Sequence, residues 1–300
     1  VTREPKKPYK EQIETVVRGA LSDAGLSLSD IECFVFTPPG LGGFPVSFMH
    51  AHHMGHYFGK ETKSLALVEN GGSTSALCVR YAMMEILSGR CKTALVVGVD
   101  RRADSPPQGM EFSHFLFDAV LMQTNLYGPY DALYGIGAPI PYYAQAGQRY
   151  MYDLGITREE LNYVAVRMRE NSSKNEKALI KERISPEDVV KSRVVCPPLH
   201  VYDCSIFGTG AAAVVLTAEP VSKKRKVRIR GYGEHHHPSS FMPTDNVGYY
   251  SPALRKASSE AFSSARLKPA DIDVVEIYGV FSTTELTILE DMGFFEEGKS

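Results

Sequence analysis

The fold is decided by a stretch that occurs twice: ALSDAGLSLSDIECFVFT at residues 20–37 and AFSSARLKPADIDVVEIY at residues 261–278. The two copies align without a gap. In each, the end of an amphipathic helix leads through a short turn to an Asp-Ile step, and a run of β-branched and aromatic residues follows. Apolar residues spaced by three to four, then nearly continuous, are typical of a helix that feeds a buried strand. Chance similarity is the alternative, and the gapless Asp-Ile junction argues against it.

A duplicated unit at the two ends of the chain predicts two α/β halves related by pseudo-twofold symmetry. We place the first half at residues 1–220, with a loop domain at about residues 102–195, and the second half at residues 221–300. The two copies predict strands at Cys33–Phe36 and Val274–Ile277. After the second strand only a short tail remains, so we expect the second half to be incomplete.

Further elements are expected between the two copies. Residues 75–88 have helical spacing, with one apolar side made of Ala76, Val79, Met83, Ile86 and Leu87. Short runs predict strands at residues 93–99, 211–217 and 227–230. Two more helices are expected at about residues 142–153 and 157–175, the second starting with a capping box of Thr157 and Glu160. The irregular stretch at about residues 102–142 is long for a loop, which favours a functional segment or a lid.

Composition and charge exclude several classes of function. The 300 residues are 43% hydrophobic and 23% charged, with a formal net charge of -2, so nothing favours nucleic acid or an anionic membrane as partner. The basic run Lys223–Lys226 is interpreted as a solvated turn. No apolar run approaches the ~18 residues of a membrane span, and no secretory signal is visible, so a cytoplasmic protein is expected. An odd number of cysteines without C-x-x-C spacing indicates reduced thiols.

Three motifs, in the right order along nearly the whole chain, resemble the thiolase family. Residues 67–77, LVENGGSTSAL, resemble the strand and helix that carry the thiolase nucleophile. Residues 203–213, DCSIFGTGAAA, resemble the family's Asp-Gly-Ala-Ala-Ala pattern. Residues 275–286, VEIYGVFSTTEL, resemble the second-half active-site strand of the sterol-carrier-protein-X branch. The resemblance implies a thiolase-like five-layer αβαβα fold of two similar halves, with a loop domain inserted in the first.

The chain departs from this pattern at the nucleophile. Thiolases place a cysteine at the start of the helix after the first motif, where this chain has Gly72 or Ser73. A thiolate at a helix N-terminus is stabilised by the macrodipole and attacks a carbonyl to give an acyl-enzyme. Glycine cannot do this, and a serine hydroxyl needs a positioned base that the sequence does not reveal. Cys78, further into the helix, is interpreted as core packing.

The second departure is Tyr278, which stands where members of this branch usually carry histidine. Its phenol can still donate and accept hydrogen bonds. An ordinary core tyrosine is the alternative interpretation. Cysteine-lacking aldolases of steroid side-chain degradation, a lipid-transfer-protein-type branch of the superfamily, resemble this chain and rely on tyrosines. That resemblance implies Tyr278 as a catalytic residue, and it implies a second catalytic tyrosine beyond the residues of this chain.

The resemblance also implies a reaction: retro-aldol cleavage of a bulky β-hydroxyacyl-CoA to a ketone or aldehyde and a shorter acyl-CoA. This carbon-carbon lyase chemistry needs a base, an enolate-stabilising hole and a proton donor, but no thiol. CoA would enter as part of the substrate, without a covalently bound cofactor. A homodimer and an OB-fold/zinc-ribbon partner protein are expected. The substrate pocket is predicted to include Gly210, His237 and Phe281.

Other interpretations stay open at this point. Acyl transfer through another nucleophile would make the chain a thiolase-type acyltransferase, and a non-catalytic subunit would bind acyl-CoA inside a complex. His52 and His56 have helical metal-pair spacing but lack a Glu or Cys partner set, so no metal site is predicted. Gly40, Gly42 and Gly43 are interpreted as a flexible loop rather than a phosphate loop.

Overall fold

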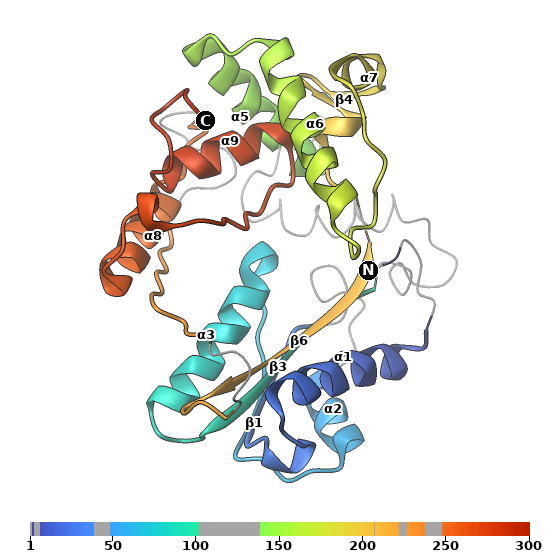
Figure 1. Ribbon diagram of the computed structural model, residues 1–300, viewed down its shortest axis with the longest axis vertical. Coiled ribbons are helices and arrows are strands. Elements are labelled where there is room, and N and C mark those ends of the chain that lie inside the picture. The colour runs from blue at the N-terminus through green and yellow to red at the C-terminus, as the bar shows by residue number, and fades with distance from the viewer. Residues whose placement is uncertain are drawn as a thin grey trace. The chain divides into compact units, whose positions relative to one another are not determined.

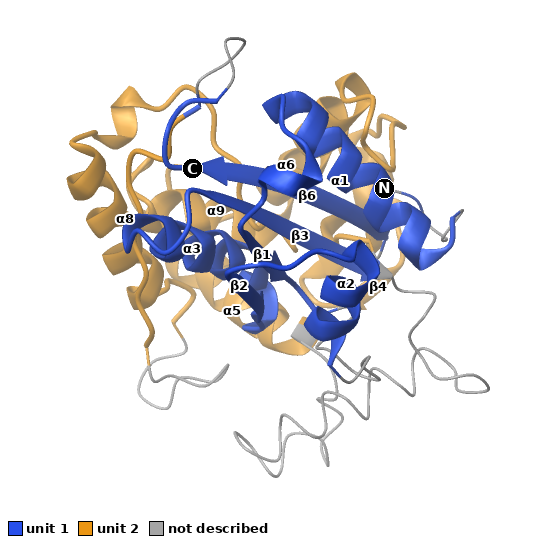
Figure 2. Ribbon diagram, turned by 90° about the horizontal axis from the view of Figure 1, so that it is seen from below, with its two compact units in different colours: residues 1–119, 207–227 blue, residues 120–206, 228–300 orange. Residues whose placement is uncertain are grey.

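The computed structural model forms two compact units, coloured separately in Figure 2: residues 1–119 with 207–227, and residues 120–206 with 228–300. The structure describes residues 2, 7–38, 49–101, 139–206, 208–221, 227–237 and 248–300. Three predictions therefore lie outside the described residues: the loop with Gly40, Gly42 and Gly43, the basic turn at residues 223–226, and the irregular stretch up to residue 138.

Unit 1 is an α/β unit built around a mixed sheet. Along the chain its elements are α1 (Tyr9–Ala24), β1 (Cys33–Phe36), α2 (His50–Phe58), β2 (Ser64–Leu67), α3 (Thr74–Leu87), β3 (Thr93–Arg101) and β6 (Thr209–Thr217). The strand order is β2-β1-β3-β6, in which β1 runs parallel to β2 and β3, while β6 is antiparallel to β3. The strands predicted at residues 33–36, 93–99 and 211–217 are confirmed.

Helices cover both faces of this sheet, as Figure 1 shows. Phe34 and Phe36 point to the face covered by α1 and α2, where they pack with Ile13 and Val17. The alternate residues of β1, Cys33 and Val35, point to the opposite face, where they pack against Cys78 and Ala82 of α3. Side chains of a strand alternate between faces, so a strand buried on both sides reads as one continuous apolar run.

Helix α3 contacts the sheet through small side chains. Cys78 and Ala82 are fully buried, whereas Leu87 is 80% exposed. The interpretation of Cys78 as core packing is confirmed, whereas Leu87, which the sequence places on the predicted apolar side of the helix, is exposed. Residues four apart share one face of a helix, so Cys78 and Ala82 define a narrow contact stripe, and Leu87 lies outside it at the end of the helix.

Unit 2 is mostly helical. Its elements are α5 (Pro139–Leu154), α6 (Arg158–Lys174), α7 (Pro186–Lys191), β4 (Val194–Cys196), β5 (Leu199–His200), α8 (Pro252–Ala265) and α9 (Ser282–Asp291). Strands β4 and β5 pair antiparallel. The predicted capping box is confirmed, because Thr157 Oγ1 accepts from the Glu160 amide and the Glu160 carboxylate accepts from the Thr157 amide. Tyr150, Leu161, Val164 and Leu286 form a core among α5, α6 and α9.

The two sequence copies have the same local geometry as far as the Asp-Ile step. Each helix ends at a residue with positive φ, Gly25 at 69° and Arg266 at 56°. The next amide then donates back to the helix, from Leu26 to Leu21 O and from Leu267 to Phe262 O, both at 3.0 Å. This is the bonding of a left-handed helix C-cap, and it occurs at equivalent positions of the repeat.

The copies differ after that step. Residues 33–36 are strand β1, whereas residues 274–277 belong to no strand, and Val274 is 77% exposed. Residues 227–230 likewise form no strand, and Val227 is 90% exposed. The strand predictions for these two segments are wrong. A strand exists only through hydrogen bonds to a neighbour, and the described part of unit 2 gives these segments no such partner.

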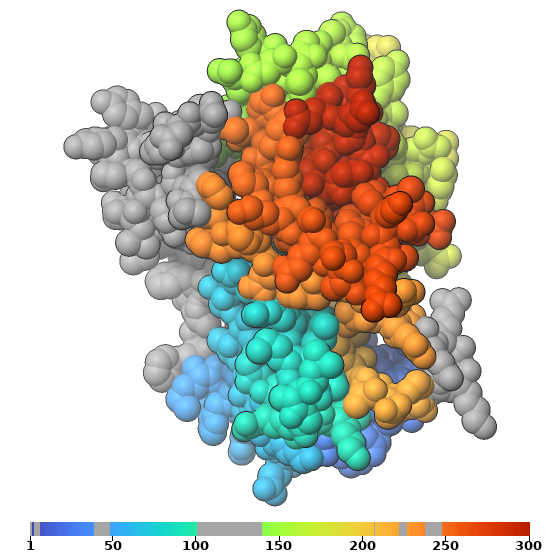
Figure 3. Space-filling model, turned by 90° about the vertical axis from the view of Figure 1, so that its left-hand side faces the viewer, coloured from blue at the N-terminus to red at the C-terminus, as the bar shows by residue number. Residues whose placement is uncertain are grey.

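Residues 228–237 pack against helix α8 instead. The Arg230 guanidinium donates to Ala265 O at 3.2 Å, and the Glu234 amide donates to the Glu260 carboxylate at 3.2 Å. Gly231 and Gly233, on the same side of the extended chain, face successive turns of α8 (orange in Figure 3). A Cβ atom at Gly233 would lie 1.8 Å from Ala257 O, so only glycine allows this approach.

Substituting Gly233→Ala should therefore destabilise unit 2 by about 1–3 kcal/mol, because the added methyl group overlaps the α8 backbone. Urea unfolding followed by circular dichroism measures the loss. The matched control is Gly19→Ala in α1, where a Cβ meets nothing within 4 Å. That change should stabilise by about 0.5–1 kcal/mol, since alanine favours helix. Equal stability of the two variants would contradict this close packing of Gly233 on α8.

Candidate active site

Two predicted site residues of unit 2, Tyr278 and Phe281, lie at a tight turn that leads into α9. The Val280 amide donates to Tyr278 O at 3.2 Å, and the Ser205 amide donates to Val280 O at 2.8 Å. An isolated bridge pairs Cys204 with Phe281. The Phe281 amide donates to Thr284 Oγ1 at 3.0 Å, which satisfies a donor at the helix start. Main-chain hydrogen bonds thus fix this turn on both sides, and Tyr278 is 60% exposed on it.

Asp203 holds the start of α9 to its surroundings. Its buried carboxylate accepts from Arg158 Nη2 at 2.7 Å and from the His200 amide at 2.8 Å. The other oxygen accepts from Ser282 Oγ at 2.9 Å. The carboxylate therefore links α6, the β5 segment and the first residue of α9, and its charge is balanced by the Arg158 guanidinium.

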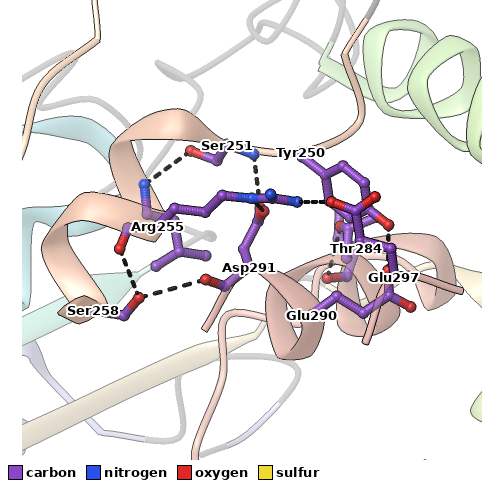
Figure 4. Close-up of polar contacts among 10 residues, drawn as sticks. Tyr250, Ser251, Arg255, Ser258, Thr284, Glu290, Asp291 and Glu297 are labelled. Atoms are coloured by element: carbon purple, nitrogen blue, oxygen red, sulfur yellow. Dashed lines mark hydrogen bonds and ion pairs between the residues drawn. The ribbon is translucent and has the colours of Figure 1, made fainter. Parts of the chain in front are cut away.

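A second network, drawn in Figure 4, holds α9 to α8. The Asp291 carboxylate accepts from the Ser251 amide and from Arg255 Nε, both at 2.7 Å. Arg255 also donates to Glu297 at 2.8 Å and lies over the Tyr250 ring, 4.4 Å from its centroid. Because α9 is anchored at its start and at its end, the turn that precedes it has a rigid support.

Replacing the first anchor by Asp203→Asn should cost about 2–4 kcal/mol of unfolding free energy, because Arg158 loses its buried counter-charge. Chemical unfolding of both proteins measures it. Asp153→Asn is the matched control, since Asp153 pairs with Arg149 on the surface of α5. Exposed pairs contribute about 0–1 kcal/mol, so the control should change little. A loss no larger than that of the control would show that Asp203 is not an anchor.

The structure adds a second tyrosine to the turn, which sequence reasoning missed. The Tyr143 ring lies 4.9 Å from the Phe281 ring, centroid to centroid. Burial raises the pKa of the Tyr143 phenol, and the nearby Tyr278 phenol raises it further. The adjacent pair Tyr142 and Tyr143 was the sequence feature that could have indicated a second site tyrosine. Both residues are more than a hundred positions from Tyr278, however, so the sequence alone does not predict that Tyr143 lies beside this turn.

Glu285 is a buried acid beside the same turn. Its side chain lies against Gly279, where a Cβ atom would be 2.8 Å from Oε1. Arg167 Nη2 lies 3.8 Å from Oε2, and Oε2 has no hydrogen-bond partner among the described residues. Burial raises the pKa of Glu285 to about 7, and Arg167 offsets only part of that rise. The positive end of α9 favours the anion as well, so desolvation outweighs both.

This raised pKa makes stability depend on pH. The folded protein binds the Glu285 proton more tightly than the unfolded chain, so the stabilisation is complete in acid and is lost as pH rises through about 7. Between about pH 5 and about pH 8 the wild-type protein should lose on the order of 3 kcal/mol relative to Glu285→Gln. Urea unfolding across that range measures the difference. Parallel pH curves for the two proteins would contradict a raised pKa.

In unit 1 the predicted nucleophile position is at the start of α3. Gly72 and Ser73 are exposed in a short 3-10 turn that precedes the helix. Ser73 Oγ donates to Asn70 O at 3.0 Å and accepts from Asn70 Nδ2 at 2.9 Å. Neither partner can remove the hydroxyl proton, so within the described residues Ser73 is not an activated nucleophile. Burial raises the pKa of the Cys78 thiol to about 11, which keeps that sulfur protonated.

The predicted pocket residues lie on different elements. Gly210 lies on β6 of unit 1, paired with Asp100 of β3. His237 ends the described segment 227–237 of unit 2, and Phe281 is buried beside Tyr143. The structure therefore brings Tyr278, Tyr143, Phe281 and Glu285 together.

Among the residues that the structure describes, no group of three or more His, Cys, Asp or Glu side chains could hold a metal ion. No described helix has the length and hydropathy of a membrane span.

Comparisons with known proteins identify relatives in sequence and in fold. Residues 233–300 match the family described as thiolase C-terminal domain-like. An acetyl-CoA acetyltransferase of Methanothermobacter thermautotrophicus is 29% identical over 97% of this chain and 74% of that protein. A steroid side-chain-cleaving aldolase of Thermomonospora curvata is 27% identical over 95% of this chain and 72% of that protein. The solved structure of the Ltp2-ChsH2(DUF35) aldolase has a TM-score of 0.78 at 23% identity, covering 98% of this chain and 74% of that one.

Fold and relatives define a thiolase-like α/β protein. Within that class, the chain is similar to sterol carrier protein 2 of Gallus gallus and to steroid side-chain aldolases, at 26–27% identity. Its relatives divide between acyltransferases and aldolases at similar identity, so the reaction has to be argued from the chemistry of the site.

Proposed function

We propose that this protein is a carbon-carbon lyase that cleaves a bulky β-hydroxyacyl-CoA by a retro-aldol reaction. The observation that carries the proposal is the start of α3, where among the described residues Ser73 Oγ is hydrogen-bonded to Asn70 alone, and the nearby Cys78 thiol is buried and protonated. Thiolysis must place an acyl group on a nucleophile, and the described residues of this helix start offer none. Retro-aldol cleavage has no such requirement.

The chemistry fits a site built on tyrosines. A base removes the β-hydroxyl proton, that oxygen forms a ketone or aldehyde carbonyl, and the Cα–Cβ bond breaks to leave the CoA enolate. A proton then returns to Cα, so the reaction consumes no net acid or base. We assign the proton-moving role to the exposed Tyr278 and propose the neighbouring Tyr143 as its partner.

The substrate, assembly and complete fold are further parts of the proposal. CoA thioesters appear in the names of the related acetyltransferase and lyase, which supports CoA as part of the substrate. The Ltp2-ChsH2(DUF35) aldolase is named after two proteins, which supports a partner protein, and we propose a partner of the OB-fold/zinc-ribbon type. We also propose a homodimer, a complete five-layer αβαβα fold, and Gly210 and His237 as pocket residues.

Acyl transfer is the second candidate, because the acetyl-CoA acetyltransferase is 29% identical to this chain. It would need a nucleophile other than Ser73 or Cys78. The two candidates differ in substrate: the lyase takes a β-hydroxyacyl-CoA, whereas the transferase takes a β-ketoacyl-CoA and free CoA.

The test is to incubate the protein, with and without a co-expressed OB-fold partner, with each of these substrates. We expect release of a ketone and a shorter acyl-CoA from a tertiary β-hydroxyacyl-CoA only. Tyr278→Phe should lower kcat by roughly 100-fold or more, because the phenolic proton is lost from the reacting centre. Tyr163→Phe, at an exposed tyrosine of α6, is the matched control and should retain full activity.

Each other outcome points elsewhere. Cleavage of the β-keto substrate alone would establish an acyltransferase with a different nucleophile. Binding of acyl-CoA without turnover, even with the partner present, would establish a non-catalytic subunit. Full activity of Tyr278→Phe on the hydroxy substrate would retain the lyase and remove Tyr278 from its mechanism.

A further inference from the structure

Two buried glutamates on α9 differ sharply in their surroundings. The Glu290 carboxylate accepts from Tyr150 Oη at 2.7 Å and from Tyr250 Oη at 2.6 Å. Burial alone would raise its pKa, but these hydrogen bonds outweigh burial and the pKa is lowered. Glu285 is 4% exposed, and one of its carboxylate oxygens has no hydrogen bond within the part of the chain that the structure describes. One glutamate is therefore a satisfied structural anion, and the other is not.

An unsatisfied buried carboxylate needs a reason, because nearly all buried polar groups in folded proteins have partners. A stabilising ion pair does not provide the reason. The Arg167 guanidinium lies 3.8 Å from the Glu285 carboxylate, and Arg167 is half-exposed, so their attraction is weak. A carboxylate held only by such a pair stabilises a fold poorly. Local arrangements that reduce stability are concentrated at functional sites.

The position of Glu285 suggests its role. Its Cγ and Oε1 occupy the space where a side chain at residue 279 would lie, with Cγ only 2.7 Å from that Cβ position. Residue 279 directly follows Tyr278 in the turn that the Ser205 amide fixes through Val280 O. Glycine at this position thus lets the acid reach the backbone next to the exposed phenol.

We propose that Glu285 is a positioning residue of the Tyr278 turn, and that gain or loss of its proton changes the surroundings of the phenol and thereby sets the pH range in which the site works. The proposal deepens the lyase function and rests on it for its catalytic consequence. The coupling between the protonation of Glu285 and the surroundings of Tyr278 does not depend on which reaction the site performs.

The charged groups around Glu285 are few in the part of the chain that the structure describes. From α6 the Arg167 guanidinium faces it. From α5 and α8, Arg149 and Arg255 pair with Asp153 and Asp291 instead. Glu285 should therefore gain and lose its proton near neutral pH, because burial raises its pKa to about 7. Removing Arg167 should move that transition to higher pH, since a cation favours the ionised acid.

The test follows the ring signal of Tyr278 by NMR in isotope-labelled, substrate-free protein from about pH 5.5 to about pH 8.5. The signal is assigned through its loss in Tyr278→Phe. We expect an inflection near neutral pH that disappears in Glu285→Gln and moves upward by about half a pH unit or more in Arg167→Met. Glu290→Gln, the same change on the same helix, is the control and should keep the inflection.

Two results would overturn the coupling: a wild-type Tyr278 signal without the inflection, or an inflection that persists in Glu285→Gln. If Glu285→Gln does not fold, the Arg167→Met variant decides instead: an inflection at the wild-type pH in that variant would also overturn the coupling. The pH profile of kcat for β-hydroxyacyl-CoA cleavage should move with the NMR transition. Absence of cleavage by the wild-type protein overturns the proposed function alone, because the NMR titration is recorded without substrate.

Discussion

The buried carboxylate of Asp203 is the interaction on which the candidate site depends. One ionised group satisfies the Arg158 guanidinium, the His200 amide and the Ser282 hydroxyl at once. A charge taken out of water is tolerable only when its partners are charged or fully hydrogen-bonded, and Asp203 has both kinds. Because these partners come from α6, the β5 segment and α9, one side chain fixes the elements that surround the Tyr278–Phe281 turn.

Helix α9 illustrates how partners rather than residue type determine the behaviour of an acid. Asp291 pairs with Arg255, Glu290 accepts from two tyrosines, and Glu285 has a single long ion pair. Burial opposes ionisation of all three carboxyl groups, and only in Glu290 do hydrogen bonds bring the pKa below its ordinary value. The acid with the fewest partners is the one that touches the turn with the exposed tyrosine.

The start of α3 has the backbone geometry that stabilises an anion but carries no cysteine sulfur at that position. A helix N-terminus stabilises an anion, and a thiolase uses this to hold a thiolate. Here the position carries Gly72 and Ser73, while the thiol one and a half turns onward faces the sheet as part of the core. The absence of an activated nucleophile among the described residues of this helix start is the observation that favours proton-transfer chemistry in our proposal.

The sequence by itself determined the elements whose signals are local: the strand Cys33–Phe36, the capped helix after Thr157, and the helix end with a short turn that occurs in both copies of the repeat. It also singled out Tyr278 and the absence of a cysteine at residues 72 and 73, because both are departures within a motif, and their roles in the reaction are predictions. Tertiary structure alone decided the rest. Residues 274–277 have strand-like composition but no described pairing partner, and Tyr143 reaches Phe281 across more than a hundred residues of chain. Hydrogen-bond partners and burial come from distant segments, so neither a strand pairing nor a raised pKa can be read from neighbouring residues.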